Sequence, residues 1–185
     1  MMDRKKTTEF LSNLLVSDRF GGMGKYWAKE VSIDPFAAKG KPKRVDYMQF
    51  VPEGQCSVSE IEKGMFICYE IKSCKQDVYS GNGLNFLGEK NYIVTTMECY
   101  KDLIPDFNDG TFARHLHEKV PDSSSHFGVM VAIPVISKMI DEFNNPTEID
   151  YESRRWKLAV IQKCIPGLRK KPMTEMLFCM LRSGH

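Results

Sequence analysis

The feature that most constrains this chain is an apolar run that ends in two charged residues. Residues 65–72 read Met-Phe-Ile-Cys-Tyr-Glu-Ile-Lys, a pattern typical of a strand buried on both faces. Because side chains alternate along a strand, Glu70 and Lys72 share one face and Ile71 lies on the other. Charged residues seldom occupy such a strand unless they are paired or functional. The run therefore predicts a packed domain with a polar site at the end of a buried strand.

A second apolar run, over residues 44–51, contains Asp46. If the two runs pair as neighbouring strands, Asp46 can lie beside Glu70. Two carboxylates suit a hard divalent cation such as Mg²⁺, for which Mn²⁺ can substitute, and a nearby ammonium can assist an attacking water and stabilise phosphate charge. We therefore predict that Asp46, Glu70 and Lys72 are catalytic. The metal ligands would be Asp46, Glu70 and the carbonyl of Ile71. A chance Glu-x-Lys at a solvated strand end is the alternative.

Basic and hydroxyl side chains flank this candidate site along the chain. The predicted nucleic-acid-binding residues are Lys41, Lys43, Arg44, Ser73 and Lys75. Lysine, arginine and serine commonly contact the phosphates of DNA. The formal net charge of +2 is too small to indicate a polyanion partner by itself, so solvated surface charge is the alternative for the basic residues. Asp77 is more typical of a residue that stabilises the start of a helix.

Length and composition favour one soluble domain. A chain of 185 residues with 42% hydrophobic and 27% charged residues can form a substantial core. The six cysteines include no Cys-x-x-Cys pair, the basic N-terminus is not followed by an apolar signal segment, and no apolar run is long enough to span a bilayer. We therefore expect a cytoplasmic protein with reduced thiols and without membrane association.

Hydrophobic periodicity predicts a mixed α/β layout. Strands are expected at 26–33, 44–51, 65–71, 92–96 and 127–133, and helices from Thr7 or Thr8 to 17, at 97–103, 136–143 and 151–164, and from 172 onwards. Pro105 is expected to end the second of these helices, and residues 106–126 give no clear prediction. The apolar stripe of the last helix favours core packing, with a homodimer contact as the alternative.

Four segments resemble the PD-(D/E)XK nuclease superfamily. They are residues 26–33, residues 44–47, residues 68–73 and Asp77. Within that superfamily the chain is most similar to the small DNA-repair-associated proteins of the MmcB type. These carry a glutamate on the first strand, Arg-x-Asp on the second, and Glu-(Ile/Val)-Lys followed by a small residue and a later aspartate. The chain departs from the pattern because Val45, not proline, precedes Asp46.

The resemblance implies a fold and an activity. The fold is a restriction-endonuclease-like αβββαβ core over residues 1–135, with a mixed central sheet flanked by helices. Residues 136–185 would form a helical C-terminal extension packed on the same domain. The implied activity is Mg²⁺-dependent endonuclease hydrolysis of DNA phosphodiester bonds, with Glu30 as a further acid near the metal. Two alternatives stay open: a catalytically degenerate DNA- or protein-binding module of the same fold, and a structural α/β domain.

Overall fold

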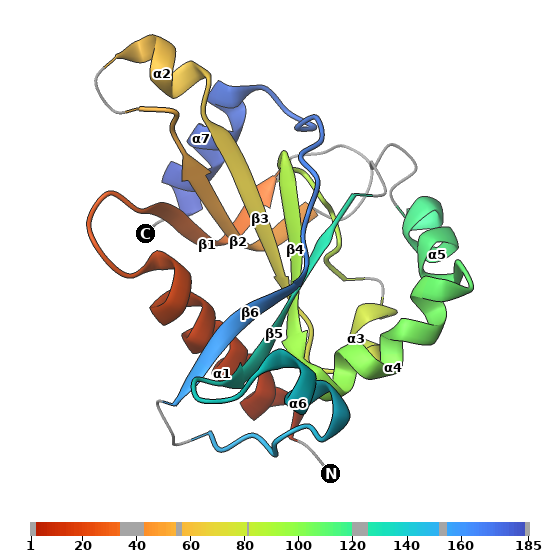
Figure 1. Cartoon of the computed structure of the whole chain (residues 1–185). Helices are drawn as coiled ribbons and strands as arrows, with labels where there is room; N and C mark the ends of the chain where they lie inside the picture. The colour runs from red at the N-terminus through yellow and green to blue at the C-terminus, as the bar shows by residue number, and fades with distance from the viewer. Residues whose placement is uncertain are drawn as a thin grey trace.

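The protein forms one mixed six-stranded sheet flanked by helices (Figure 1). The computed structural model describes residues 3–33, 43–54, 57–80, 82–119, 126–151 and 155–183. The strands are β1 (Tyr26–Ile33), β2 (Lys43–Val51), β3 (Met65–Ile71), β4 (Lys90–Thr96), β5 (Gly128–Pro134) and β6 (Trp156–Gln162), and they lie in the sheet in sequence order. β2 is antiparallel to both of its neighbours, β1 and β3; β4 and β5 continue parallel to β3, and β6 returns antiparallel. The predicted pairing of residues 44–51 with 65–71 is confirmed.

Three of the helices begin at residues whose side chains cap their first turn. The helices are α1 (Arg4–Leu15), followed by the π-helical turn η1 (Val16–Phe20), α2 (Val58–Glu62), α3 (Lys75–Val78), α4 (Met97–Asn108), α5 (Thr111–Lys119), α6 (Met139–Asn144) and α7 (Met173–Ser183). Asp3 caps α1 by accepting from the backbone N–H of Lys5 at 3.0 Å. Ser57 and Glu60 form a capping box at α2, and Thr96 caps α4. Each cap satisfies N–H groups that have no partner inside the helix.

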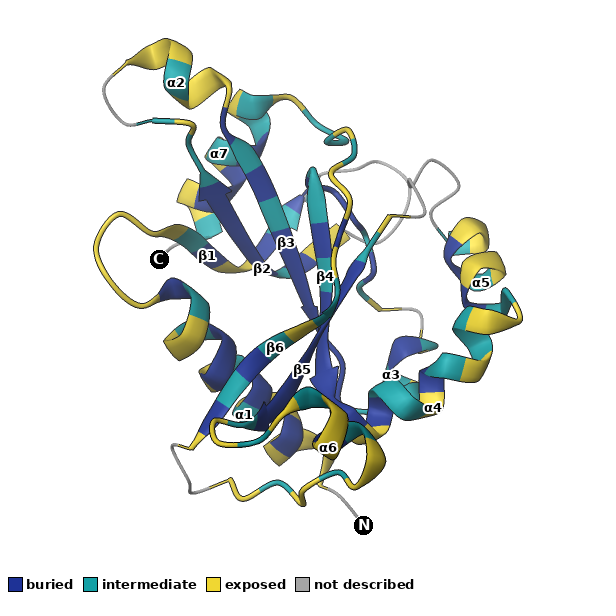
Figure 2. Cartoon of the chain, viewed as in Figure 1, coloured by how far each residue is buried: buried dark blue, intermediate teal, exposed yellow. Residues whose placement is uncertain are grey.

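The helices cover the two faces of the sheet unequally. α1 packs along one face, where Leu11 and Leu15 bury against Tyr69 and Ile71 of β3. On the other face α7 covers β1 to β3, whereas α4, α5 and α6 lie over β4 and β5. The segment at residues 84–87 contributes to both of these groups. In Figure 2 the central strands are largely buried, and the exposed residues lie mainly on the helices and loops.

One helix prediction near the middle of the chain needs correction, and the segment that follows it, which gave no prediction, contains a helix. Pro105 does not end α4 but lies inside it, and its carbonyl accepts from the N–H of Asp109 at the helix end. Residues 106–126, which gave no clear prediction, contain α5, whose buried Phe112 and Leu116 pack against α4. Proline removes one hydrogen bond, and here the apolar packing of both helices compensates for it.

The predicted helix at 151–164 is wrong, because residues 156–162 form strand β6. Trp156 and Leu158 bury against the α1 side, while Ala159 and Ile161 pack on the opposite side, a period of two rather than 3.6. The open edge of β5 supplies the backbone partners that a strand needs. The C-terminal extension is therefore not purely helical.

The predicted helix at 136–143 is confirmed only over its second part. The helix α6 begins only at Met139, and Ile136 and Ile140 are 90% and 61% exposed. Only Met139 and Phe143 of the expected stripe pack on the sheet. Within the described ranges, no helix has both the length and the apolar character needed to cross a membrane.

Candidate functional site

The candidate site lies where strands β2 and β3 separate. Their ladder ends at the pair Tyr47 and Tyr69, so the next pair in register would be Asp46 and Glu70. At this point the Asp46 side chain replaces the ladder, because its Oδ2 accepts a hydrogen bond from the backbone N–H of Ile71 at 2.9 Å. Register and hydrogen bonding together fix Asp46 beside the Glu-x-Lys end of β3.

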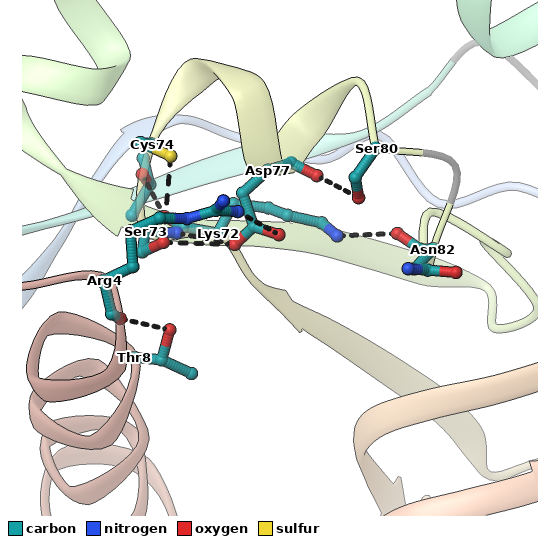
Figure 3. Close-up of polar contacts among 9 residues, drawn as sticks. Arg4, Thr8, Lys72, Ser73, Cys74, Asp77, Ser80 and Asn82 are labelled. Atoms are coloured by element: carbon teal, nitrogen blue, oxygen red, sulfur yellow. Dashed lines mark hydrogen bonds and ion pairs between the residues drawn. The ribbon is translucent and has the colours of Figure 1, made fainter.

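Glu70 and Lys72 are both buried, on the face of the sheet opposite to α1. Glu70 is 1% exposed, and within the described residues neither of its carboxylate oxygens has a hydrogen-bond partner. Lys72 is 3% exposed, and its Nζ donates to the backbone carbonyl of Asn82 at 2.7 Å (Figure 3). A buried ionised carboxylate without hydrogen bonds is costly. Such a group calls for a proton, a cation or a nearby compensating charge, and Lys72 is the nearest cationic side chain on its own strand.

The segment at residues 82–86 covers the carboxylate. A side chain on Gly83 would meet Glu70 Oε2 at 2.5 Å and Lys72 Nζ at 3.1 Å, so only glycine fits here. Leu84 and Phe86 adopt positive φ angles of 57° and 47°, which are rare for bulky residues and cost on the order of 1–3 kcal/mol each. Both side chains are nevertheless buried. Strain of this kind is typical of segments whose shape is required at a site.

Burial dominates the electrostatics of the two carboxylates. It raises the pKa of Glu70 well above its usual value, and the neighbouring charge of Asp46 raises it further. The Lys72 ammonium and the approaching N–H groups of Leu84 and Asn85 oppose this rise in the pKa. Burial likewise raises the pKa of Asp46, against the lowering influence of the Ile71 N–H and Lys72. Ionisation of both Asp46 and Glu70 is therefore unfavourable in the folded protein. A cation bound between them would make it favourable.

Glu30 lies on β1 directly across from Asp46 in the register, between the paired residues Lys29 and Val31. Its φ is 53°, an unusual conformation for a residue inside a strand. The side chain is exposed and lies 3.9 Å from Arg44. The structure therefore places a third acid at the edge of the site. Its side chain lies in solvent, however, and not beside the buried Glu70.

Two cavities meet at Asp46. One, of about 830 Å³, extends from Asp46 to the exposed face of α1. The other, of about 650 Å³, extends from Asp46 to Lys72, Asn82 and Gly83. They share Thr8, Arg44, Asp46, Ile71 and Asp77 as lining residues. The two cavities form one cleft across the ends of β2 and β3, and we call it the candidate cleft.

The other predicted residues occupy different positions relative to this cleft. Lys43 and Arg44 are exposed at its edge. Ser73 lines it, but the hydroxyl and backbone N–H both donate to Asp77, as Figure 3 shows for the side chains. Asp77 thus stabilises the turn that leads into α3. Lys75 points to α4, where its Nζ pairs with Asp106 at 2.8 Å. This position differs from the phosphate contact that we expected for Lys75. Lys41 lies outside the described residues.

Several residues of the site have no counterpart in the sequence-based prediction. The Asn82 carbonyl accepts from Lys72, and the Gly83 backbone lies against Glu70. The Asn85 side chain donates to the Arg44 carbonyl at 2.7 Å. The only sequence signal for them is the glycine in a polar stretch, which is equally typical of an ordinary loop. Among the described residues there is no group of three or more histidine, cysteine, aspartate or glutamate side chains that could hold a metal ion.

Comparison with known proteins gives no further assignment: no protein-family model, curated protein or solved structure matches the chain significantly. The functional argument therefore depends on the residues themselves. Those residues are two neighbouring carboxylates and a buried lysine, and the cleft is lined by Asp46 and Lys72. The second carboxylate, that of Glu70, lies behind Gly83 and has no hydrogen-bond partner within the described residues.

Proposed function

We propose that the protein is a divalent-metal-dependent nuclease that hydrolyses phosphodiester bonds of DNA. Asp46 and Glu70 would hold Mg²⁺, and Lys72 would assist the attacking water. The observation that carries the proposal is the Glu70 carboxylate. It is buried directly behind Gly83, which lines the cleft, and in the described part of the chain neither of its oxygens has a hydrogen-bond partner. Buried titratable groups in a cleft are typical of functional sites.

The donor set fits Mg²⁺ better than a structural transition-metal site. Mg²⁺ uses one or two carboxylates, keeps several waters and takes further oxygens from a substrate phosphate. Asp46, Glu70 and the Ile71 carbonyl supply oxygen donors, in agreement with the hard character of this ion. The two unsatisfied oxygens of Glu70 are the donors that most need a cation. Glu30 is too exposed to be more than an outer partner.

The chain's own residues suggest how the reaction is organised. When bound, Mg²⁺ supplies Lewis-acid stabilisation of phosphate charge and makes a bound water more acidic. The Ile71 N–H orients Asp46 through its Oδ2. The Asn82 carbonyl holds the Lys72 ammonium on the face of β3 that carries Glu70. From there the ammonium can donate a hydrogen bond to a phosphate oxygen or to the water, which stabilises developing negative charge.

The order of elements supports placing the chain in the PD-(D/E)XK superfamily. α1 precedes three antiparallel strands, and the short α3 then leads to β4, which runs parallel to β3. This order is that of the αβββαβ core implied by the resemblance. α3 has only four residues, so the helix that usually links the last two strands of the core is much reduced.

A binding module without cleavage is the second candidate function. The observation that favours it is the close cover over Glu70, whose carboxylate is 1% exposed and lies against Gly83. In such a protein the buried Glu70 and Lys72 would stabilise the fold, and the cleft would hold DNA uncut. Two buried groups of opposite charge that lie near each other are compatible with a purely structural role.

Cleavage of supercoiled, linear and single-stranded DNA distinguishes the two candidates. The nuclease proposal predicts cutting by the wild type in Mg²⁺ or Mn²⁺, none in EDTA, and loss of cutting in Lys72→Ala. Lys75→Ala is the matched control, because this neighbouring lysine pairs with α4 and does not line the cleft. DNA binding without cutting by the wild type would favour the binding module. Cutting that survives Lys72→Ala would contradict the proposed site.

A further inference from the structure

The exposed face of α1 forms one wall of the candidate cleft. Helix residues that line the cleft are Arg4, Lys5, Thr8, Glu9, Ser12 and Asn13. They recur at helical spacing, and all are polar. The opposite face of the same helix buries Leu11, Leu14 and Leu15 in the core. A helix held so firmly by its apolar side presents its polar side to the cleft in a fixed orientation.

Two ammonium groups, one on this wall and one on the strand that faces it, make no ion pair with an acid in the described part of the chain. Within the described residues, Lys5 makes no ion pair, and only its backbone N–H is engaged, with Asp3. Lys29 on β1 lies over the Tyr47 ring, 5.8 Å from its centroid, and likewise has no acidic partner in the described part of the chain. The two guanidinium groups nearby differ, because Arg4 pairs with Asp77 at 3.5 Å and Arg44 lies near Glu30.

The acids of the same cleft are largely accounted for. Asp77 accepts two hydrogen bonds from Ser73 in addition to the ion pair with Arg4. Asp46 is a ligand of the proposed cation, which would neutralise it. In the described part of the cleft, Glu9 on α1 is the one acid whose side chain makes neither an ion pair nor a hydrogen bond. With the cation bound, the balance of charge on the α1 side of the cleft therefore favours an anion.

We propose that this wall binds the phosphate backbone of the DNA strand on one side of the cleaved bond, with Lys5 and Lys29 as its phosphate contacts. The inference depends on the proposed function, because Asp46 and Lys72 mark the cleavage point within the same cleft. Lysine binds phosphate as a point charge, and hydroxyl groups such as those of Thr8 and Ser12 add hydrogen bonds. The contact is to the backbone, so it applies to any base sequence.

The chain provides a matched control in the adjacent residue. Lys6 is also exposed on α1, but it faces a different cavity, near Glu98 and Tyr151. Lys5→Ala, Lys29→Ala and Lys6→Ala therefore remove the same charge from the protein, two of them inside the cleft and one outside it. Thermal melting of each variant verifies that the fold is retained.

The experiment measures fluorescence polarisation of a labelled 20-nucleotide DNA, as a single strand and as a duplex, over a range of salt concentrations. Ca²⁺ replaces Mg²⁺, and the intact length of the DNA is verified after each titration. Loss of one phosphate contact is expected to weaken binding about fivefold to tenfold near 0.1 M salt. It should also reduce the slope of log K against log salt by about 0.9 for duplex or about 0.7 for a single strand.

We expect this change for Lys5→Ala and Lys29→Ala and little change for Lys6→Ala. Equal effects of all three variants would mean that only overall charge matters, and the inference would be overturned. No effect of Lys5→Ala and Lys29→Ala, or no DNA binding by the wild type, would overturn it as well. The proposed function fails separately, through absence of metal-dependent cleavage in the wild type, so an active enzyme with unaffected variants rejects only the α1 contact.

Discussion

Replacing Glu70 by glutamine tests whether its buried carboxylate destabilises the protein unless a cation is present. Glutamine keeps the shape of the side chain but cannot ionise. In the wild type the folded-state pKa of Glu70 is raised, chiefly by burial. The folded protein therefore holds the proton more tightly than the unfolded chain. Below about pH 4.5, the ordinary pKa of glutamate, Glu70 is protonated in both the folded and the unfolded state. As the pH rises above this value toward the folded-state pKa, the folded protein loses stability relative to the unfolded chain.

The expected magnitude follows from the environment of the two oxygens. Neither has a hydrogen-bond partner, and leaving a buried polar group unsatisfied costs about 1–3 kcal/mol, and more if the group is charged. For a chain of this length, each kcal/mol corresponds to about 2–4 °C in Tm. Between pH 5 and pH 8 we expect the wild type to lose several degrees relative to Glu70→Gln. Glu62→Gln, an exposed control, should follow the wild type.

Addition of the cation should reverse this loss. For a dissociation constant on the order of 1 mM, about 10 mM free Mg²⁺ or Mn²⁺ would stabilise the folded state by about 1.4 kcal/mol. At pH 8 the wild type should therefore gain about 3–6 °C by differential scanning fluorimetry or calorimetry, whereas Glu70→Gln should gain much less. The reasoning is refuted if the pH profiles of wild type and Glu70→Gln coincide, or if the cation stabilises both equally.

Three further experiments test individual contacts. Gly83→Ala and Gly110→Ala both place alanine at positive φ, but an added Cβ meets Glu70 Oε2 at 2.5 Å in the first and nothing closer than 3.8 Å in the second. Urea unfolding should show the larger loss for Gly83→Ala, and equal losses would contradict the contact. Lys72→Met combined with Glu70→Gln should deviate from additivity by about 0.5–3 kcal/mol in a double-mutant cycle. Strict additivity would mean that the two charges do not interact. Glu89→Gln should cost about 1–3 kcal/mol by urea unfolding, because its carboxylate accepts from a β3 N–H and pairs with the C-terminal segment. A loss below about 0.5 kcal/mol would show that this bridge is dispensable.

The strands were predictable because their patterns are set by burial. Runs such as residues 44–51 and 65–71 are apolar on both faces, and helices cover both faces of the sheet at these strands. Strand β6 was not predictable, because its seven residues are compatible with a helix and only the open edge of β5 decides the outcome. In the same way, α4 continues through Pro105 because packing against α5 outweighs a local signal that normally ends a helix.

The candidate site was predictable only in part. Strand alternation places Glu70 and Lys72 on one face, and hairpin-like pairing brings Asp46 beside them. The cover formed by residues 82–86 depends on positive φ angles at Leu84 and Phe86, which no local propensity favours. The wall formed by α1 depends on how that helix docks on the sheet, a tertiary property that the composition of the helix does not encode.

The most direct test of the central claim is an anomalous diffraction measurement on crystals of the wild type soaked in Mn²⁺. The account predicts an anomalous peak between the carboxylates of Asp46 and Glu70, close to the Ile71 carbonyl, and its loss in crystals of Glu70→Gln. A peak at another group of acids, or no peak at this position in crystals of an enzyme that cleaves DNA in solution, would contradict the assignment of Asp46 and Glu70 as the metal site.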